Sequence, residues 1–267
     1  MNKHISQDNV LRYALVTGAS RGLGKAIALE LAARGIPTIL TGTNERVKEV
    51  CEEIRTYYGT PSICFKLDLT DVGNLKTVAD TINAQYQVYL LVNNAGVGGT
   101  KDFVNASDRY LAHIVDLNVR GTVLFTHQLL PNLLRQKRSH ILNIGSMAAL
   151  SPIGYKTVYP ASKSFVFAFS LALREELKHT PVTVSVASPG AMATNPEVCT
   201  RIRKQGFLGR LTLKPTDTIA RKCVRQTLRG KRHIIVNPLS YFASSIFPNC
   251  IKTPILTNIV KKEIKNK

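Results

Sequence analysis

The sequence of 267 residues lacks several patterns that would assign it to other classes of protein. No uninterrupted apolar run reaches eighteen residues, so a transmembrane helix is not expected. Residues 1–9 are polar and lack the apolar core of a secretory signal peptide. The five cysteines stand singly, with neither the Cys-x-x-Cys spacing of a zinc site nor a disulfide framework. These absences and the odd number of cysteines favour a cytoplasmic protein without a bound metal.

Acidic residues are also scarce: 17 stand against 36 lysines and arginines, which gives a net charge of +19. Residues 1–200 hold 20 basic and 15 acidic residues, whereas residues 201–267 hold 16 and 2. Such a block favours an acidic carrier, a phosphate-bearing substrate or an anionic membrane surface as the partner. A membrane surface as partner would place the protein peripherally at a membrane. A solvated basic face without a partner is equally compatible. Nucleic acid is not favoured, because no aromatic interleaving or nucleic-acid motif accompanies the basic residues.

Short apolar runs alternate with longer amphipathic segments along the first two-thirds of the chain. The predicted strands are residues 11–17, 37–41, 62–67, 88–93, 140–144, 182–187 and 233–236. The predicted helices are residues 22–34, 44–58, 71–86 and 107–136, and one that carries Tyr159 and ends near Lys178. This alternation predicts an α/β fold of three layers, a Rossmann-type doubly wound parallel sheet of about seven strands with helices on both faces. We expect one domain over residues 1–237, including a substrate loop at about 191–213, and then a basic, partly apolar tail over residues 238–267.

A glycine-rich turn, Thr17-Gly18-Ala19-Ser20-Arg21-Gly22-Leu23-Gly24, follows the first predicted strand and leads directly into a helix. Glycine lets the backbone approach a pyrophosphate, which then lies at the positive end of the helix. The second predicted strand ends at Thr41-Gly42-Thr43-Asn44, without the acid that binds the ribose 2′-hydroxyl of NAD. Arg21 could meet a 2′-phosphate, so NADP(H) is preferred, and NAD(H) remains the alternative if Glu45 serves as that acid.

Tyr159 and Lys163 lie four residues apart on a predicted helix and therefore share a face. A free tyrosine has a pKa of about 10, and a neighbouring ammonium lowers the pKa by stabilising the phenolate. We interpret the pair as a device for proton transfer. On its own the spacing is far more typical of a solvated helix surface, and its weight comes from Ser146 and the glycine-rich turn.

Taken together, the motifs of residues 13–194 resemble those of the short-chain dehydrogenase/reductase superfamily. The matching elements are the glycine-rich turn, Asp68, Asn93-Asn94-Ala95-Gly96, Asn118, Ser146, Tyr159-x-x-x-Lys163, Pro189-Gly190 and Thr194. The resemblance implies four catalytic residues. Tyr159 would donate a proton to the carbonyl oxygen and accept it in the reverse direction, and Ser146 would hydrogen-bond that oxygen. Lys163 would hold the nicotinamide ribose, and Asn118 would position a water that relays protons to the lysine.

The resemblance also implies the cofactor-binding residues. These are Gly18, Ser20, Arg21, Gly22, Leu23, Gly24, Thr43, Asp68, Leu69, Asn94, Ala95, Gly96, Tyr159, Lys163, Pro189, Gly190 and Thr194. The implied activity is NADP(H)-dependent reduction of a ketone or 3-oxoacyl carbonyl, or the reverse reaction, in a homodimer or homotetramer. The alternatives are a non-catalytic NADP-binding scaffold or sensor, and a basic protein that binds a membrane surface.

The resemblance weakens in the C-terminal third. The strand expected at residues 233–236 runs into Asn237-Pro238-Leu239-Ser240-Tyr241-Phe242, which is unlike bacterial 3-oxoacyl-carrier-protein reductases. The ending looks more like the branch of hydroxysteroid and long-chain 3-oxoacyl reductases. The tail could form a lid over the site, pack against a second subunit, rest on an anionic membrane or be disordered. In and beside the substrate loop, Met192, Phe207, Leu208 and Leu211 suit an apolar substrate.

Overall fold

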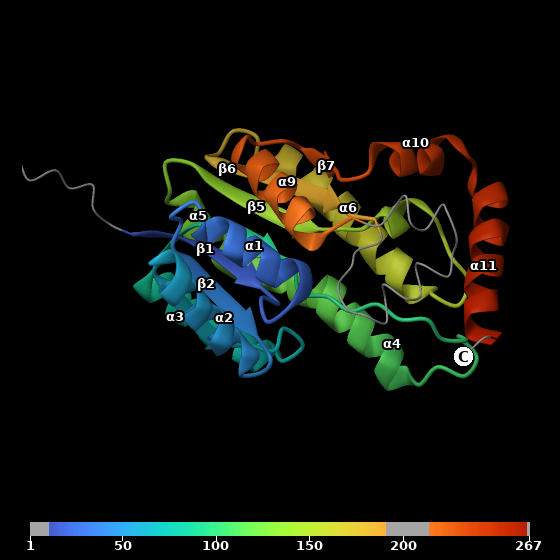
Figure 1. The fold of residues 1–267 in the computed structure, drawn as a ribbon, viewed down its shortest axis with the longest axis horizontal. Helices are drawn as coiled ribbons and strands as arrows, with labels where there is room; N and C mark the ends of the chain where they lie inside the picture. The colour runs from blue at the N-terminus through green and yellow to red at the C-terminus, as the bar shows by residue number, and fades with distance from the viewer. Residues whose placement is uncertain (1–10, 191–213, 266–267) are drawn as a thin grey trace, which may run out of the picture.

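The computed structural model describes residues 11–190 and 214–265. Its centre is a parallel sheet of seven strands in the order β3-β2-β1-β4-β5-β6-β7 (Figure 1). The strands are β1 (Arg12–Thr17), β2 (Thr38–Gly42), β3 (Ser62–Lys66), β4 (Gln87–Asn93), β5 (Ser139–Ile144), β6 (Val182–Ser188) and β7 (His233–Ile235). The predicted doubly wound fold is confirmed, and each strand boundary lies within one residue of its predicted position.

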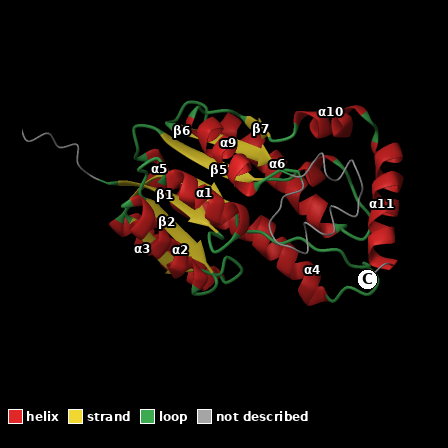
Figure 2. Cartoon of the chain, in the orientation of Figure 1, coloured by secondary structure: helices red, strands yellow, loops and turns green. Residues whose placement is uncertain are grey.

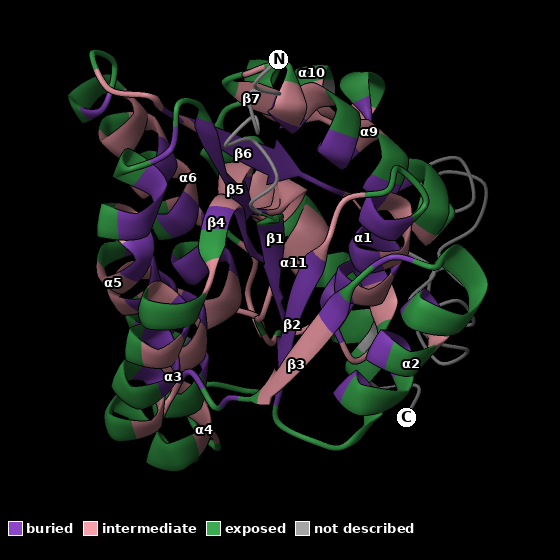
Figure 3. Cartoon of the chain, turned by 90° about the vertical axis from the view of Figure 1, so that its left-hand side faces the viewer, coloured by how far each residue is buried: buried purple, intermediate pink, exposed green. Residues whose placement is uncertain are grey.

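Helices cover both faces of the sheet (Figures 2 and 3). One face carries α1 (Gly22–Ala32), α2 (Arg46–Tyr58) and α9 (Thr216–Leu228), and the other carries α3 (Val72–Gln85), α4 (Asp108–Val115), α5 (Thr122–Leu134) and α6 (Val158–Glu176). Successive side chains of a strand point to opposite faces. Val16 therefore packs into the core on the α1 side, whereas Leu15 packs into the core on the α5 side. Both side chains are fully buried, as expected for a central parallel strand.

The order of the strands creates a crevice between β1 and β4. From β1 the chain builds the sheet outward through β2 and β3, and then returns to place β4 on the other side of β1. The connections that leave the carboxyl ends of β1 and β4 therefore diverge to opposite faces of the sheet. Ligands of open α/β sheets bind at such a switch point.

The long helix predicted over residues 107–136 is interrupted. Between α4 and α5 lies a π-helical segment, η1 (Asp116–Gly121), which contains the buried Asn118. A Cβ on Gly121 would lie 2.9 Å from the Cβ of Leu69, so this turn packs closely against the loop after β3. The wider turn changes the direction of the side chains that follow it, and such segments often occur at functional sites.

The segment predicted as a tail is helical where the structure describes it. It forms α10 (Pro238–Ile246) and α11 (Asn249–Lys265). Figure 1 places α11 at one end of the molecule. The Nζ of Lys252 donates to the carbonyl oxygen of Leu150 at 2.8 Å, and the hydroxyl of Thr257 accepts from the backbone N–H of Gly154 at 2.9 Å. Both contacts join α11 to the segment between β5 and α6. Among the described helices, none has the length and hydropathy needed to cross a bilayer.

Candidate active site

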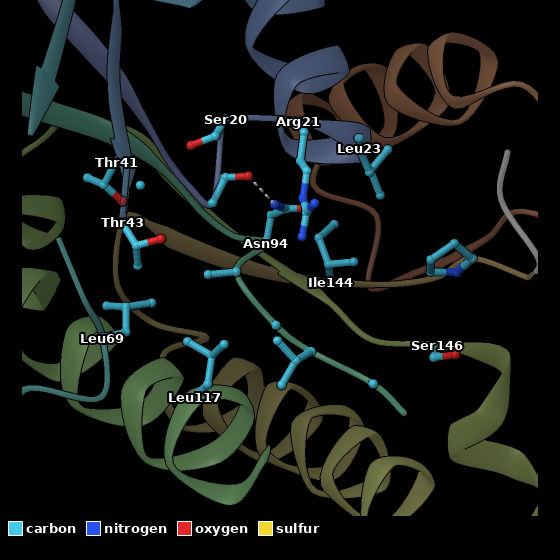
Figure 4. Close-up of a pocket in the computed structure, with 18 of the residues that line it drawn as sticks. Ser20, Arg21, Leu23, Thr41, Thr43, Leu69, Asn94, Leu117, Ile144 and Ser146 are labelled. Carbon is cyan, nitrogen blue, oxygen red and sulfur yellow. Dashed lines mark hydrogen bonds between the residues drawn. The ribbon is translucent and has the colours of Figure 1, made fainter. Parts of the chain in front are cut away.

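A cleft of about 480 Å³ opens at the carboxyl ends of β1 and β4 (Figure 4). Fourteen of the residues predicted to bind the cofactor line it: Gly18, Ser20, Arg21, Gly22, Leu23, Thr43, Leu69, Asn94, Ala95, Gly96, Tyr159, Lys163, Pro189 and Gly190. Ser146 also lines it. Further lining residues that the sequence analysis did not name as site residues are Thr41, Gly42, Asn44, Leu67, Val97, Gly98, Leu117, Ile144 and Gly145. The volume is that of an ordinary small-molecule site.

The glycine-rich turn is held closed by its neighbours. The backbone of Gly18 has a φ of +64°, in the left-handed region that favours glycine. A Cβ on Gly24 would lie 2.3 Å from the carbonyl oxygen of Gly18 and 2.4 Å from the Nδ2 of Asn94. That Nδ2 donates to the carbonyl oxygens of Thr17 and Gly18, at 2.9 and 3.2 Å. Gly24 therefore does not line the cleft, and its role is to let α1 begin directly beneath the turn.

The N-terminus of α1 is open to an anion. Its N-cap residue, Arg21, makes no capping hydrogen bond with its side chain, and the first turn contains no acid. By contrast, α3 and α4 are capped by the side chains of Asp71 and Ser107. Figure 4 shows the side chain of Arg21 extending into the cleft. Uncapped N–H groups, a glycine backbone without Cβ atoms and a nearby guanidinium fit the pyrophosphate of a dinucleotide.

The lining residues at the end of β2 carry no carboxylate. They are Thr41, Gly42, Thr43 and Asn44. Glu45 does not line the cleft; its carboxylate lies 2.6 Å from the Nζ of Lys48, and both side chains are exposed. The hydrogen bond and charge of Lys48 lower the pKa of Glu45. Glu45 is therefore engaged elsewhere on the surface.

Two predicted cofactor-binding residues after β3 differ in their placement. Leu69 lines the cleft, but Asp68 does not. The Oδ1 of Asp68 accepts hydrogen bonds from the N–H and the hydroxyl of Thr70, at 2.9 and 2.8 Å. The carboxylate of Asp68 thus shapes the loop that presents Leu69. The prediction for Thr194 lies outside the described residues.

Lys163 lines the cleft but is almost fully buried. It is 6% exposed, and its Nζ donates to the carbonyl oxygen of Ile144 at 2.8 Å. Burial lowers the pKa of the Lys163 ammonium to about 8, and no acidic side chain opposes this effect. A Cβ on Gly96 would lie 3.3 Å from this Nζ, so a glycine is what allows the lysine to reach the cleft here.

The phenol of Tyr159 has a raised pKa. Burial is the larger cause, and a hydrogen bond with the side chain of Ser146 acts in the opposite direction. Lys163 is not among the causes that shift this pKa; its ammonium donates to the carbonyl of Ile144. The phenol is therefore protonated at neutral pH, which is the state that a proton donor requires.

The other two predicted catalytic residues are anchored by hydrogen bonds. Asn118 exchanges two with the backbone of Val97, both at 2.8 Å, and donates a third to the hydroxyl of Ser162 at 2.9 Å. It lies 1% exposed below the cleft and joins the loop after β4 to α6, the helix that carries Tyr159. Ser146 accepts a hydrogen bond from the N–H of Ala148 at 3.1 Å, and its own hydroxyl proton serves the hydrogen bond with the phenol of Tyr159.

The fold and the cleft define an enzyme of the dinucleotide-binding Rossmann class, with a phenol, a hydroxyl and an ammonium at one end of the site. The family model for short chain dehydrogenases matches residues 12–203, and the chain belongs to this family. It is thus an oxidoreductase that interconverts an alcohol and a ketone with a nicotinamide cofactor.

Relatives and solved structures agree with this assignment. An uncharacterized short-chain dehydrogenase/reductase of Sinorhizobium fredii is 35% identical over 190 residues, which are 70% of this chain and 72% of the relative. The 3-oxoacyl-acyl-carrier-protein reductase of Escherichia coli is 32% identical over 185 residues, 69% of this chain and 75% of that one. A short-chain dehydrogenase of Sphingobium yanoikuyae, solved with NADPH, has a TM-score of 0.77 at 23% identity over 88% of this chain and 92% of its own. A 7β-hydroxysteroid dehydrogenase has a TM-score of 0.80 at 19% identity, over 92% and 96%. At these identities the two structures show the fold alone.

Proposed function

We propose that the enzyme uses NADP(H) to reduce the carbonyl of an apolar ketone or 3-oxoacyl substrate, with Tyr159 as the proton donor. The observation that carries this proposal is that Ser146, Tyr159 and Lys163 line the same cleft as the glycine-rich turn. The cofactor, when bound, supplies the hydride. The residues of the chain transfer the proton, hydrogen-bond the carbonyl oxygen and position the reactants.

In this proposal Tyr159 donates its proton to the carbonyl oxygen as negative charge develops there. The raised pKa keeps the phenol protonated until that moment, and the hydroxyl of Ser146, which hydrogen-bonds the phenol, can turn to donate a second hydrogen bond to the substrate oxygen. Lys163 carries a proton below a pH of about 8 and lines the same cleft, so in this proposal it resupplies the proton to the phenol. Asn118 acts as a positioning residue, since it fixes the loop after β4 against α6.

The preference for NADP(H) is supported by charge. Arg21, Thr43 and Asn44 all line the cleft, and no acid lies among the lining residues that would repel a 2′-phosphate. A guanidinium is well suited to a phosphate because it donates several hydrogen bonds in one plane. The ion pair of Glu45 with Lys48, outside the lining of the cleft, further favours NADP(H) over NAD(H).

The substrate class is supported by a relative. The E. coli relative at 32% identity is named a 3-oxoacyl-acyl-carrier-protein reductase, and the basic surface of this chain would suit an acidic carrier. Homodimers or homotetramers, the division into a domain and a tail, and a cytoplasmic location stay predictions. The scaffold alternative is less favoured, because the predicted tetrad of Asn118, Ser146, Tyr159 and Lys163 is complete in the sequence.

The test is oxidation of NADPH and of NADH by the purified full-length protein across a panel of ketones and 3-oxoacyl thioesters. We expect turnover with NADPH on at least one apolar carbonyl and a loss of that turnover in Tyr159→Phe. Tight binding of NADPH without turnover on any carbonyl would support the scaffold instead. Turnover that Tyr159→Phe leaves undiminished would remove the proposed mechanism.

A further inference from the structure

We propose that α10 and α11 form a docking face for a membrane of anionic lipid. This inference goes beyond the proposed function, and the docking does not depend on catalysis. It rests on the arrangement of apolar and basic residues on these two helices.

The first observation is a set of exposed apolar side chains on α10, α11 and the turn between them, here named the apolar stripe: Leu239, Phe242, Ile246, Phe247, Ile251, Ile255 and Ile259. On α11 its members are spaced by four residues, so they lie along one side of the helix. Ile251, Ile255 and Ile259 are 47, 55 and 42% exposed, whereas Val260, on another side, is 6% exposed. The helix therefore has a separate inner surface, and the apolar stripe contributes little to the core.

The second observation is charge. Residues 238–267 contain five lysines and one acid, Glu263. Lys261 and Lys262 are exposed in the last turns of α11, next to the end of the apolar stripe. An amphipathic surface with flanking lysines binds at a lipid interface by burying its apolar side chains while its ammonium groups meet anionic headgroups.

The same charge argues against a second copy of the chain as the occupant. A symmetric dimer places the same patch of both subunits in contact. Here that contact would bring two lysine-rich segments together, each with a single acid, and like charges would oppose it. An anionic bilayer has the opposite charge and can take up apolar side chains of the stripe.

The position of the docking face links it to the site. Lys252 and Thr257 of α11 hydrogen-bond to Leu150 and Gly154, in the segment that begins just after Ser146. A membrane bound at α11 would therefore lie on the substrate side of the cleft, where a lipid-soluble carbonyl compound could enter. This consequence rests on the proposed function; the docking itself does not.

The test is co-sedimentation of the full-length protein with phosphatidylcholine vesicles, with and without phosphatidylglycerol. One variant carries Ile255→Gln and Ile259→Gln, and a second carries Lys261→Gln and Lys262→Gln. The matched control carries Tyr57→Gln and Leu134→Gln, which change exposed apolar residues at the C-terminal ends of α2 and α5. Thermal melting and turnover, measured on every variant, check that each is folded.

We expect the wild type and the control to bind vesicles only when phosphatidylglycerol is present. Each docking-face variant should bind on the order of tenfold more weakly, since each lysine near an anionic surface and each buried apolar group adds to the affinity. Turnover on a water-soluble substrate should stay unchanged in all variants. Equal sedimentation of all four proteins would overturn the proposal. Sedimentation velocity gives a second outcome that would overturn it. If the wild type is a dimer and only the isoleucine variant is not, the face binds a second copy of the chain.

Discussion

Replacing Lys163 by methionine tests the electrostatics of the site, because it removes a buried charge while keeping a side chain of similar length. Lys163 is 6% exposed, and its Nζ donates to the carbonyl of Ile144. Burial alone lowers the pKa of the ammonium from 10.5 to about 8. The folded protein therefore carries this charge at neutral pH at a cost in stability.

The size of that cost follows from the two pKa values. One pH unit corresponds to about 1.36 kcal/mol, so a fall from 10.5 to about 8 corresponds to about 3 kcal/mol. Losing the hydrogen bond to the Ile144 carbonyl costs about 1 kcal/mol, which is smaller. Below pH 8 the folded and unfolded chains both hold the proton, and the full penalty applies. Between pH 8 and 10.5 the folded chain releases the proton while the unfolded chain retains it, so the stability of the wild type rises relative to the variant.

The assay is urea unfolding at a series of pH values, followed by far-ultraviolet circular dichroism because the chain has no tryptophan. At neutral pH we expect Lys163→Met to be at least as stable as the wild type. As the pH approaches 10.5, the free energy of unfolding of the wild type should rise by about 3 kcal/mol relative to that of Lys163→Met. Lys76→Met, at an exposed position of α3, is the control for losing a positive charge. A difference between wild type and Lys163→Met that is independent of pH would refute the reasoning.

Three further predictions concern the cofactor and the scaffold of the site. Arg21→Ala should raise the Kd of NADPH about tenfold or more and leave that of NADH nearly unchanged, because a charge-assisted hydrogen bond contributes about 1.5–3 kcal/mol; equal losses in calorimetric titrations would contradict a role at the 2′-phosphate. Asn118→Ala should lower the free energy of unfolding by about 1–3 kcal/mol, since it leaves the partly buried backbone N–H and C=O of Val97 without these partners; an unchanged urea midpoint would contradict this. Gly24→Ala should abolish NADPH binding and lower the Tm, because its Cβ would meet a carbonyl oxygen of the turn at 2.3 Å. Gly73→Ala, where a Cβ meets nothing closer than 3.4 Å, is its control, and equal behaviour of the two variants would disprove the steric argument.

The strands of this protein were predictable because a parallel sheet covered on both faces needs continuous apolar runs. Leu15, Val16 and Leu91, for example, are fully buried, and each lies in such a run. The helix α1 was predictable for the same reason, together with the glycines of the turn. The local pattern and the tertiary requirement agree along these segments.

Two backbone features had no signal in the sequence. The π-helical turn at Asn118 depends on packing against Leu69 and on hydrogen bonds to Val97, contacts that are far away in the chain. Tyr155 has a φ of 62°, a conformation that bulky residues rarely adopt. Its carbonyl accepts a hydrogen bond from the N–H of Lys101 at 2.7 Å. Tertiary contacts hold both features against local preference.

The site was predictable in its motifs but not in its electrostatics. A spacing of four residues places Tyr159 and Lys163 on one helix face, but it does not say where the Nζ finds an acceptor. That acceptor is the carbonyl of Ile144, at the end of strand β5. Residues such as Leu117 and Ile144 line the cleft only because the sheet brings separate segments to one edge, which no local motif encodes.

The most direct test of the central claim is single-turnover oxidation of bound NADPH by a carbonyl substrate, compared between the wild type and Tyr159→Phe. A buried, protonated phenol that acts as the proton donor contributes about 10²–10⁴ to the rate. We therefore expect the rate to fall by about this factor while the Kd of NADPH stays the same. An equal rate in both proteins at saturating NADPH would show that the proton comes from another group.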